Sequence, residues 1–360
     1  MYDIDYVVFN LTGGVELSLY QLLKSVFKSI YKNSGDLVKN IHFIRNIKNI
    51  FRVIKAGIIA DQIKSIEPKL VITVIDNSTL FHLVSKICDD ILFLAIQNGT
   101  RSIWCATNML DKNIKYNIDE YFCFGPQVQD MFSKYQHNIK KYHNCGSLLG
   151  GHFLTSKLNE SASNKKKYDI CLISQWSKDL IDFDKLPKNY MRLNEAITIL
   201  TEYLALYALE NNKRVCIALR SDDPSELEYY ERLFNGNCVY QRRDETEFSS
   251  YIAAVNSNLI ISLHSTLALE SFGMGLKVLF VNTIGEDWLR ATTDMGIWYL
   301  SKPDYQLFCS RVEQLLDMSQ DEYLVSAKKE MKYVMLFDHN RPAHVVIRDR
   351  VLDIIGTTKE

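Results

Sequence analysis

The sequence lacks the features of a membrane-spanning, secreted or nucleic-acid-binding protein. Its 42 basic and 43 acidic residues leave a formal net charge of −1, so no overall field attracts nucleic acid. No apolar run reaches the length of a membrane span, and the first segment, "MYDIDYVVFNLTGG", carries acidic residues where a signal peptide is basic. We therefore expect a cytoplasmic protein that binds no nucleic acid.

Patterns for structural metals and disulfides are also missing. The eight cysteines are scattered without a CxxC pair, and several lie in apolar segments, where a free cysteine behaves as a small hydrophobic residue. This spacing argues against a zinc site and against a disulfide framework. We expect neither a bound metal nor a cofactor.

The chain does contain regularly alternating short apolar and longer amphipathic segments. At 360 residues and 47% hydrophobic composition, it can bury the cores of two domains. In the first half, the predicted strands are Tyr6–Phe9, Leu70–Ile75, Ile91–Ile96, Tyr121–Phe124 and Ile139–Tyr142, and the predicted helices are Val15–Tyr31, Ile47–Ile66 and Thr79–Ile87. Nearly continuous apolar strands that alternate with helices are typical of a parallel, doubly wound sheet.

A change of composition divides the chain into two parts. Residues 146–169 are rich in Gly, Ser, Asn and Lys, which predicts a linker, here placed at 149–167, between domains at 1–148 and 168–342. The segment 343–357 is expected to form a helix that packs back on the first domain. The second series has predicted strands Ile170–Ser174, Val215–Leu219, Cys238–Tyr240, Leu259–Leu263 and Val278–Val281, and predicted helices near Leu193–Glu210, Ser225–Phe234 and Glu245–Val255. Two Rossmann-like domains facing across a cleft form the GT-B architecture.

The segment "SLHSTLALE", residues 262–270, places polar residues between a buried strand and a helix. Ligands of open α/β sheets bind beyond the carboxyl ends of strands, where a helix start offers free N–H groups. His264, Ser265 and Thr266 could donate to phosphate oxygens, and Glu270 could accept from ribose hydroxyls. The alternative is an ordinary Ser or Thr N-cap beside a histidine that bonds a neighbour.

This segment resembles one found in bacterial GT-B glycosyltransferases of capsule, O-antigen and lipopolysaccharide. The shared pattern is S-x-x-S-T-x-x-x-E-x-x-x-x-G-x-x-V, at residues 262–278. Four further segments are similar to the same group: "IQNGTR" (96–101), "DEYFCFG" (119–125), "YDICLISQ" (168–175) and "VCIALRSDDPSELEYY" (215–230). The resemblance extends to retaining Kdo transferases that use CMP-Kdo. It implies that the second domain binds the donor nucleotide and the first domain binds the acceptor.

Other polar residues at strand ends complete the expected cleft. On the donor side these are Ser174, Gln175 and Arg220, and on the acceptor side Gly13, Gly14, Gln97, Asn98 and Arg101. The candidate catalytic carboxylates are Asp76, Asp222 and Asp223. An inverting reaction favours Asp76 as a base, whereas a covalent retaining route favours Asp222 or Asp223. The structural alternatives are a polar turn at 174–176, a positive-φ turn at Asn98-Gly99, and an N-cap role for Asp223 before Pro224.

One amphipathic segment bears on partners. Residues 40–57 set apolar Phe43, Ile47, Ile50, Phe51 and Ile54 at helical spacing, with Arg45, Lys48, Arg52 and Lys55 largely between them. Such a helix either lies on an anionic membrane surface or packs on the core with a solvated face. Peripheral contact with the cytoplasmic face of the inner membrane would suit a lipid-linked acceptor.

Together these features predict a glycosyltransferase. Its donor would be CMP-Kdo or a nucleoside-diphosphate sugar, and its acceptor a growing surface polysaccharide or lipopolysaccharide. Arg220, His264 and the helix N-terminus would stabilise the leaving phosphate in place of a metal. The alternatives are a nucleotide-sugar 2-epimerase of the same fold and a non-catalytic nucleotide- or carbohydrate-binding protein.

Overall fold

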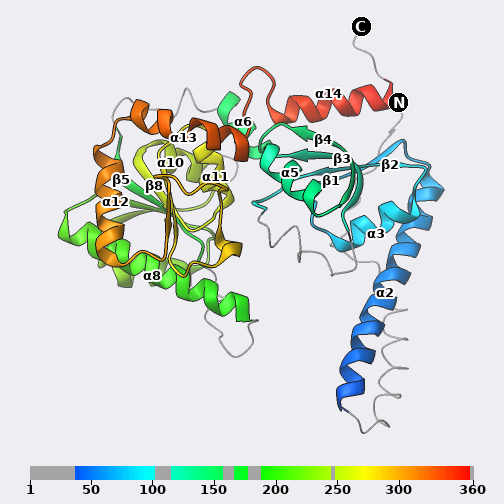
Figure 1. Ribbon diagram of the computed structural model, residues 1–360, viewed down its shortest axis with the longest axis horizontal. Coiled ribbons are helices and arrows are strands. Elements are labelled where there is room, and N and C mark those ends of the chain that lie inside the picture. Colours follow the sequence, from blue (N-terminus) through cyan, green and yellow to red (C-terminus); the bar gives the residue numbers. More distant parts are fainter. Residues whose placement is uncertain (1–36, 102–114, 157–165, 177–187, 245–247, 357–360) are drawn as a thin grey trace.

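The computed structural model describes residues 37–101, 115–156, 166–176, 188–244 and 248–356, with only the backbone of 37–50 and 188–191 (Figure 1). Two parallel sheets form separate α/β units along the chain. The predicted strand Tyr6–Phe9, the predicted helix Val15–Tyr31, and the candidate residues Gly13 and Gly14 lie outside the described residues.

The first unit is built on sheet A, whose strands pair in the order β1-β2-β3-β4. The strands are β1 (Leu70–Thr73), β2 (Leu92–Ile96), β3 (Asn117–Cys123) and β4 (Asn138–Asn144), all parallel, with helices α2 (Leu37–Ile66), α3 (Thr79–Ile87) and α5 (Pro126–Lys134). Successive strand residues point to opposite faces. Phe93 and Ala95 therefore pack with α2 and α3, while Leu94 and Ile96 pack on the other face.

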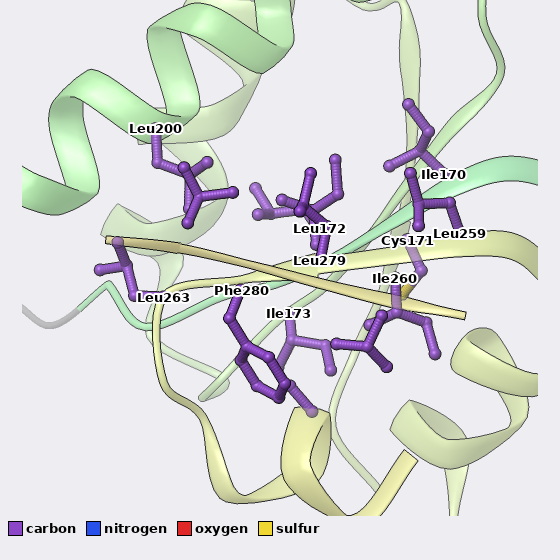
Figure 2. Packing of buried hydrophobic residues seen from close by; sticks show 14 of the residues in the cluster. Ile170, Cys171, Leu172, Ile173, Leu200, Leu259, Ile260, Leu263, Leu279 and Phe280 are labelled. Carbon is purple, nitrogen blue, oxygen red and sulfur yellow. The ribbon is translucent and has the colours of Figure 1, made fainter. Parts of the chain in front are cut away.

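The second unit is built on sheet B, whose strands pair in the order β10-β9-β8-β5-β6-β7. Its elements are β5 (Tyr168–Ile173), α8 (Lys188–Glu210), β6 (Val215–Ala218), α9 (Pro224–Phe234), β7 (Cys238–Gln241), α10 (Ser249–Val255), β8 (Ser257–Ser262), α11 (Thr266–Gly273), β9 (Val278–Asn282), β10 (Tyr299–Ser301), α12 (Tyr305–Asp317) and α13 (Gln320–Val334). Side chains of the central strands form the core between the sheet and its helices (Figure 2).

The strand order of sheet B creates a topological switch point. From β5 the chain builds outward through β6 and β7, and then returns to add β8 on the other side of β5. Loops that follow β5 and β8 therefore diverge at the carboxyl end of the sheet, which is where open α/β sheets bind ligands. These loops carry Gln175 and His264.

Part of the predicted linker is instead a packed helix. Residues 149–156 belong to α6 (Leu148–Ser156), in which Phe153 and Leu154 are buried. Its glycines reflect close packing rather than flexibility: a Cβ on Gly150 would lie 2.8 Å from the ring of Phe337. Composition alone does not distinguish these two uses of glycine.

The last helix, α14 (Ala343–Ile355), lies on sheet A (Figure 1). Ile347 packs with apolar side chains from the three strands β1, β2 and β3. Arg350 donates to both oxygens of Glu120 on β3, and Oε2 of Glu120 also lies 2.6 Å from Nε2 of His143. The chain therefore crosses between the units twice, at α6 and before α14.

Helix α2 buries only part of its apolar surface. Ala56, Ile59 and Ile63 are buried against the first unit, whereas Val53 and Ile54 are 55% and 40% exposed. Ile54 was predicted on the apolar face of this helix. Among the described residues, no helix is long and apolar enough to cross a membrane.

Candidate functional site

A cavity of about 930 Å³ lies between the two units at the carboxyl ends of their strands. Its lining includes nine of the residues predicted from the sequence: Gln97, Asn98, Ser174, Gln175, Arg220, His264, Ser265, Thr266 and Glu270. The volume is in the range of small-molecule and cofactor sites. All seven residues expected on the donor side are thus brought to one cavity, from the ends of β5, β6 and β8 and from α11.

The N-terminus of α11 opens into this cavity. Ser265 is the N-cap, but its side chain makes no capping hydrogen bond, which differs from the alternative interpretation. The backbone N–H groups of Thr266, Leu267 and Ala268 have no acceptor among the described residues, because the first intrahelical bond is donated by Leu269. Unpaired N–H groups at a helix start attract an anion.

His264 precedes this helix and is held by Gln175. The backbone N–H of His264 donates to Gln175 Oε1 at 3.0 Å, and Gln175 Nε2 lies 3.1 Å from His264 Nδ1. The ring is edge-on to Trp288, with centroids 6.1 Å apart. Burial lowers the pKa of His264 to about 4. The imidazole is therefore neutral at pH 7 and approaches a ligand as a hydrogen-bonding group rather than as a cation.

Arg220 provides positive charge at the end of β6. It is exposed and lines the cavity, and its guanidinium has no hydrogen-bond partner within the described part of the chain. Its backbone is fixed by Glu226, a fully buried carboxylate that accepts from the N–H groups of Arg220 and Ser221, both at 2.9 Å. Sequence reasoning missed Glu226, although an acidic residue three positions after the Asp223 N-cap is a helix-start signal.

Ser174 is placed to support Glu226 rather than a ligand. Its hydroxyl donates to Glu226 Oε1, and it accepts from the hydroxyl of Tyr230 at 2.9 Å and from the N–H of Trp176 at 3.2 Å. The side chain is buried. Ser174 therefore holds the loop after β6 against the end of β5.

Glu270 lies one turn inside α11 and connects the two units. Ser147, next to the start of α6, donates to one carboxylate oxygen, and the Tyr251 hydroxyl donates to the other at 2.6 Å. Burial raises the pKa of Glu270 to about 7, partly offset by these two hydrogen bonds. The backbone N–H of Gly150 also favours the charged carboxylate, and the carboxylate could still accept from a ligand hydroxyl.

Asp76 and Arg101 form a buried ion pair, which argues against the roles predicted for them. All five N–H groups of Arg101 are used: two on Asp76, one on Asn98 Oδ1, and two on the carbonyls of Gly99 and Thr100. Asp76 also accepts from the Tyr121 hydroxyl and the N–H of Asn98. Neither side chain lines the cavity. This pair shapes the loop at 97–101, so a catalytic Asp76 and an acceptor-binding Arg101 do not fit the geometry.

The other two candidate carboxylates are also away from the cavity. Asp223 caps α9 by accepting from the N–H of Ser225 at 3.0 Å, which is the structural alternative considered above. Asp222 is exposed and does not line the cavity. Gln97 is occupied as well, because it accepts from the N–H of Phe124 and donates to the carbonyl of Gly99.

The loop of the first unit touches the second unit directly. The Thr100 N–H donates to Thr266 Oγ1 at 3.2 Å, and the Thr100 hydroxyl donates to the carbonyl of His264 at 3.4 Å. The two walls of the cavity therefore meet at the start of α11.

The cavity includes residues that carried no signal in the sequence. They are His152 from α6, Arg243 and Asp244 after β7, Tyr251 from α10 and His344 from α14. Segments remote in sequence bring them together. No three His, Cys, Asp or Glu side chains of the described residues are grouped as metal ligands.

Two parallel-sheet α/β units joined across this cavity define a GT-B fold. Residues 94–347 match a protein family described as "putative O-antigen biosynthesis protein", and the chain belongs to that family. No curated protein sequence matches the chain.

Solved structures with the same fold are distant in sequence. UDP-GlcNAc 2-epimerase from Neisseria meningitidis bound to UDP-GlcNAc is 14% identical, with a TM-score of 0.51, over 82% of this chain and 80% of that one. The Methanocaldococcus jannaschii UDP-GlcNAc 2-epimerase in complex with UDP-GlcNAc and UDP is 12% identical, with a TM-score of 0.51, over 83% and 79%. A glycosyltransferase from Rickettsia africae is 15% identical, with a TM-score of 0.46, over 90% and 89%. The two epimerase structures, with TM-scores above 0.5, support the fold alone at these identities.

Proposed function

We propose that the protein is a glycosyltransferase that moves a sugar from a nucleotide-activated donor to a surface-polysaccharide or lipopolysaccharide acceptor during O-antigen assembly. One observation carries the proposal: Thr266 and Leu267, whose N–H groups have no acceptor among the described residues, line the same cavity as the cationic Arg220 and the neutral ring of His264. Such a set of donors is suited to the phosphates of a nucleotide. Membership of an O-antigen family supports the acceptor class.

In this proposal the donor occupies the side of the cavity formed by sheet B. Its phosphates lie at the start of α11, and Glu270 accepts hydrogen bonds from the ribose hydroxyls. The candidate donors are CMP-Kdo and nucleoside-diphosphate sugars. A thermal-shift screen with CMP, UDP, GDP and their sugars identifies the nucleotide.

Negative charge grows on the phosphate as the sugar leaves. Fixed N–H groups, Arg220 and His264 stabilise that charge without reorganising, and closure of the cleft excludes water that would hydrolyse the donor. We expect turnover to persist in excess EDTA. A complete loss that Mg²⁺ or Mn²⁺ restores would contradict this route.

The acceptor occupies the side formed by the first unit. Val74 and Leu149 line the cavity there and are 55% and 45% exposed, which suits an acceptor with a carbon-rich part. Helix α2 also exposes Val53 and Ile54. We therefore include peripheral contact of residues 40–57 with the cytoplasmic face of the inner membrane, where a lipid-linked glycan would be presented.

Calorimetric titration with the preferred nucleotide tests the site. Arg220→Met and His264→Phe are each expected to weaken binding about tenfold or more, because each removes a hydrogen bond to a charged group. Arg242→Met is the matched control: Arg242 is an exposed neighbour that does not line the cavity, and its replacement is expected to leave the affinity unchanged. Wild-type affinity in all three variants would contradict the assignment of Arg220 and His264 to the phosphate site.

Turnover distinguishes this function from its alternatives. Transfer of radiolabelled sugar to a lipopolysaccharide or lipid-linked glycan acceptor supports the glycosyltransferase. Conversion of the nucleotide sugar to its 2-epimer without an acceptor would indicate the epimerase. Nucleotide binding with neither transfer, epimerisation nor hydrolysis would indicate a non-catalytic binding protein.

A further inference from the structure

The amide of Gln175 has only one orientation that satisfies its neighbours. Its Oε1 lies 3.0 Å from the backbone nitrogen of His264, which can only donate. The Ser262 hydroxyl donates to the same oxygen at 3.2 Å, while Ser262 Oγ accepts from the N–H of Ser265, also at 3.2 Å. Turning the amide over would place its NH₂ group against a backbone N–H. The oxygen therefore faces the loop, and the NH₂ group faces the imidazole.

This orientation determines where the imidazole carries its proton. An amide nitrogen donates and does not accept, so His264 Nδ1, 3.1 Å from Gln175 Nε2, must accept and carry no proton. A neutral imidazole has one N–H, which is then at Nε2. Among the described residues Nε2 has no hydrogen-bond partner, and the residue lines the cavity.

We propose that Gln175 is a positioning residue that holds His264 in the Nε2–H tautomer, so that the ring donates a neutral hydrogen bond to the anionic group of the ligand. The identity of that ligand rests on the proposed function, whereas the tautomer does not. With the Nδ1 lone pair engaged by Gln175 and Nε2 protonated, His264 has no lone pair left for the substrate. It is therefore a hydrogen-bond donor and is excluded as the base that activates an acceptor.

Nitrogen-15 NMR of the histidine rings measures the tautomer directly. His264→Gln assigns the signal of His264 among the eight histidines of the chain. In the wild-type protein we expect the Nε2–H tautomer from pH 5.5 to 8. A wild-type ring protonated at Nδ1, or one that titrates between pH 6 and 7, would overturn the proposal.

Two substitutions separate positioning from packing. Gln175→Glu keeps the shape and can still accept from the backbone N–H of His264, but its second oxygen accepts instead of donating. We expect the proton to move to Nδ1, or the ring to become an imidazolium. Gln175→Met removes both hydrogen bonds to His264 and the one from Ser262, and we expect a mixture of tautomers. An unchanged His264 spectrum in both variants would show that Gln175 does not set the tautomer.

Titration with inorganic pyrophosphate tests the ligand half of the proposal in the same spectra. We expect pyrophosphate to shift the Nε2–H resonance of the wild-type ring. If pyrophosphate binds by calorimetry and this resonance does not move, the ring does not donate to the anion and that half is wrong. If neither pyrophosphate nor any nucleotide binds while the wild-type tautomer is Nε2–H, the proposed function fails and the assignment of Gln175 stands.

Discussion

At the scale of single residues, the polar side chains around the cleft divide into two groups. Arg220 and His264 line the cavity. Neither the guanidinium of Arg220 nor Nε2 of His264 has a hydrogen-bond partner among the described residues. Asp76, Arg101 and Ser174 are buried, and their hydrogen-bonding groups are taken up within the protein. The first group can bind a ligand, whereas the second maintains the shape of the loops.

Asp76→Asn separates a structural from a catalytic role. The amide would leave the buried guanidinium of Arg101 without a counter-charge, so we expect the free energy of unfolding to fall by about 3–5 kcal/mol. Urea denaturation measures this loss. Asp222→Asn, at an exposed position, is the control and should change stability by less than about 0.5 kcal/mol. Wild-type stability of Asp76→Asn together with a hundredfold loss of turnover would restore Asp76 as a catalytic residue.

Glu270 should make stability depend on pH in an identifiable way. Its folded-state pKa of about 7 lies above the ordinary value of 4.5, so its contribution is most favourable below pH 4.5 and is lost as pH rises toward 7. Glu270→Gln carries no charge and can still bond both hydroxyls. We expect it to raise the stability at pH 8 by on the order of 3 kcal/mol, and by less than about 1 kcal/mol near pH 5. Thermal denaturation at the two pH values measures the difference.

A contrasting carboxylate provides the control for Glu270. The four groups that bond Glu226 all act as donors, two of them backbone N–H groups. In Glu226→Gln the side-chain NH₂ group would face one of these backbone N–H groups, and two donors cannot form a hydrogen bond. We therefore expect a lower melting temperature at pH 8. A gain at Glu270→Gln that is the same at pH 5 and pH 8 would show that relief of a buried charge is not its cause.

At the scale of elements, two glycines allow close packing against the segment that connects α13 to α14. A Cβ on Gly125 would lie 2.6 Å from the carbonyl oxygen of Tyr333 and 2.9 Å from the carbonyl carbon of Val334. A Cβ on Gly273 would lie 2.6 Å from the Cβ of Met335. Both glycines contact the segment that leaves α13 for α14.

Gly125→Ala tests this contact. The φ of Gly125 is −170°, which any residue adopts, so the cost of the methyl group is steric and we expect a loss of about 1–3 kcal/mol. Gly57→Ala in α2 is the matched control, because nothing lies within 4 Å of its added methyl group. We expect it to gain up to about 1 kcal/mol from helix propensity. Similar denaturation curves for the two variants would contradict close packing at Gly125.

Element prediction succeeded where the pattern is local. Thr79–Ile87 was predicted with the bounds that α3 has, since a Ser78 cap and an apolar face mark it. Helices α12 and α13 were not among the predicted elements, although the Asp304 cap and the Ser319–Glu322 capping box mark their starts. Part of helix α6 was assigned to the linker because of its glycines, whereas its packing partners, such as Tyr251 and Phe337, lie far along the chain.

At the scale of the whole molecule, α14 couples the end of the chain to the first unit. Ile347 is 8% exposed between α14 and sheet A, and a carboxylate there would be buried without a partner. We expect Ile347→Asp to release α14 and to make the chain sensitive to limited proteolysis near residue 340. Val325→Asp, at an 85% exposed position on α13, should resist protease like the wild type. Equal resistance of both variants would show that docking of α14 contributes little to stability.

The sequence by itself determined the parallel α/β architecture and the position of the cavity at the carboxyl ends of β5 and β8. Continuous apolar strands require helices on both faces, and polar residues directly after β5 and β8 point to the switch point. Only the tertiary structure decided which polar groups remain available to a ligand. Arg101 lies 25 residues from Asp76, and Ser147 lies 123 residues from Glu270, so their hydrogen bonds exist only after the chain has folded. A side chain at the mouth of a cleft stays available to a ligand only when no such distant partner takes up its hydrogen-bonding groups.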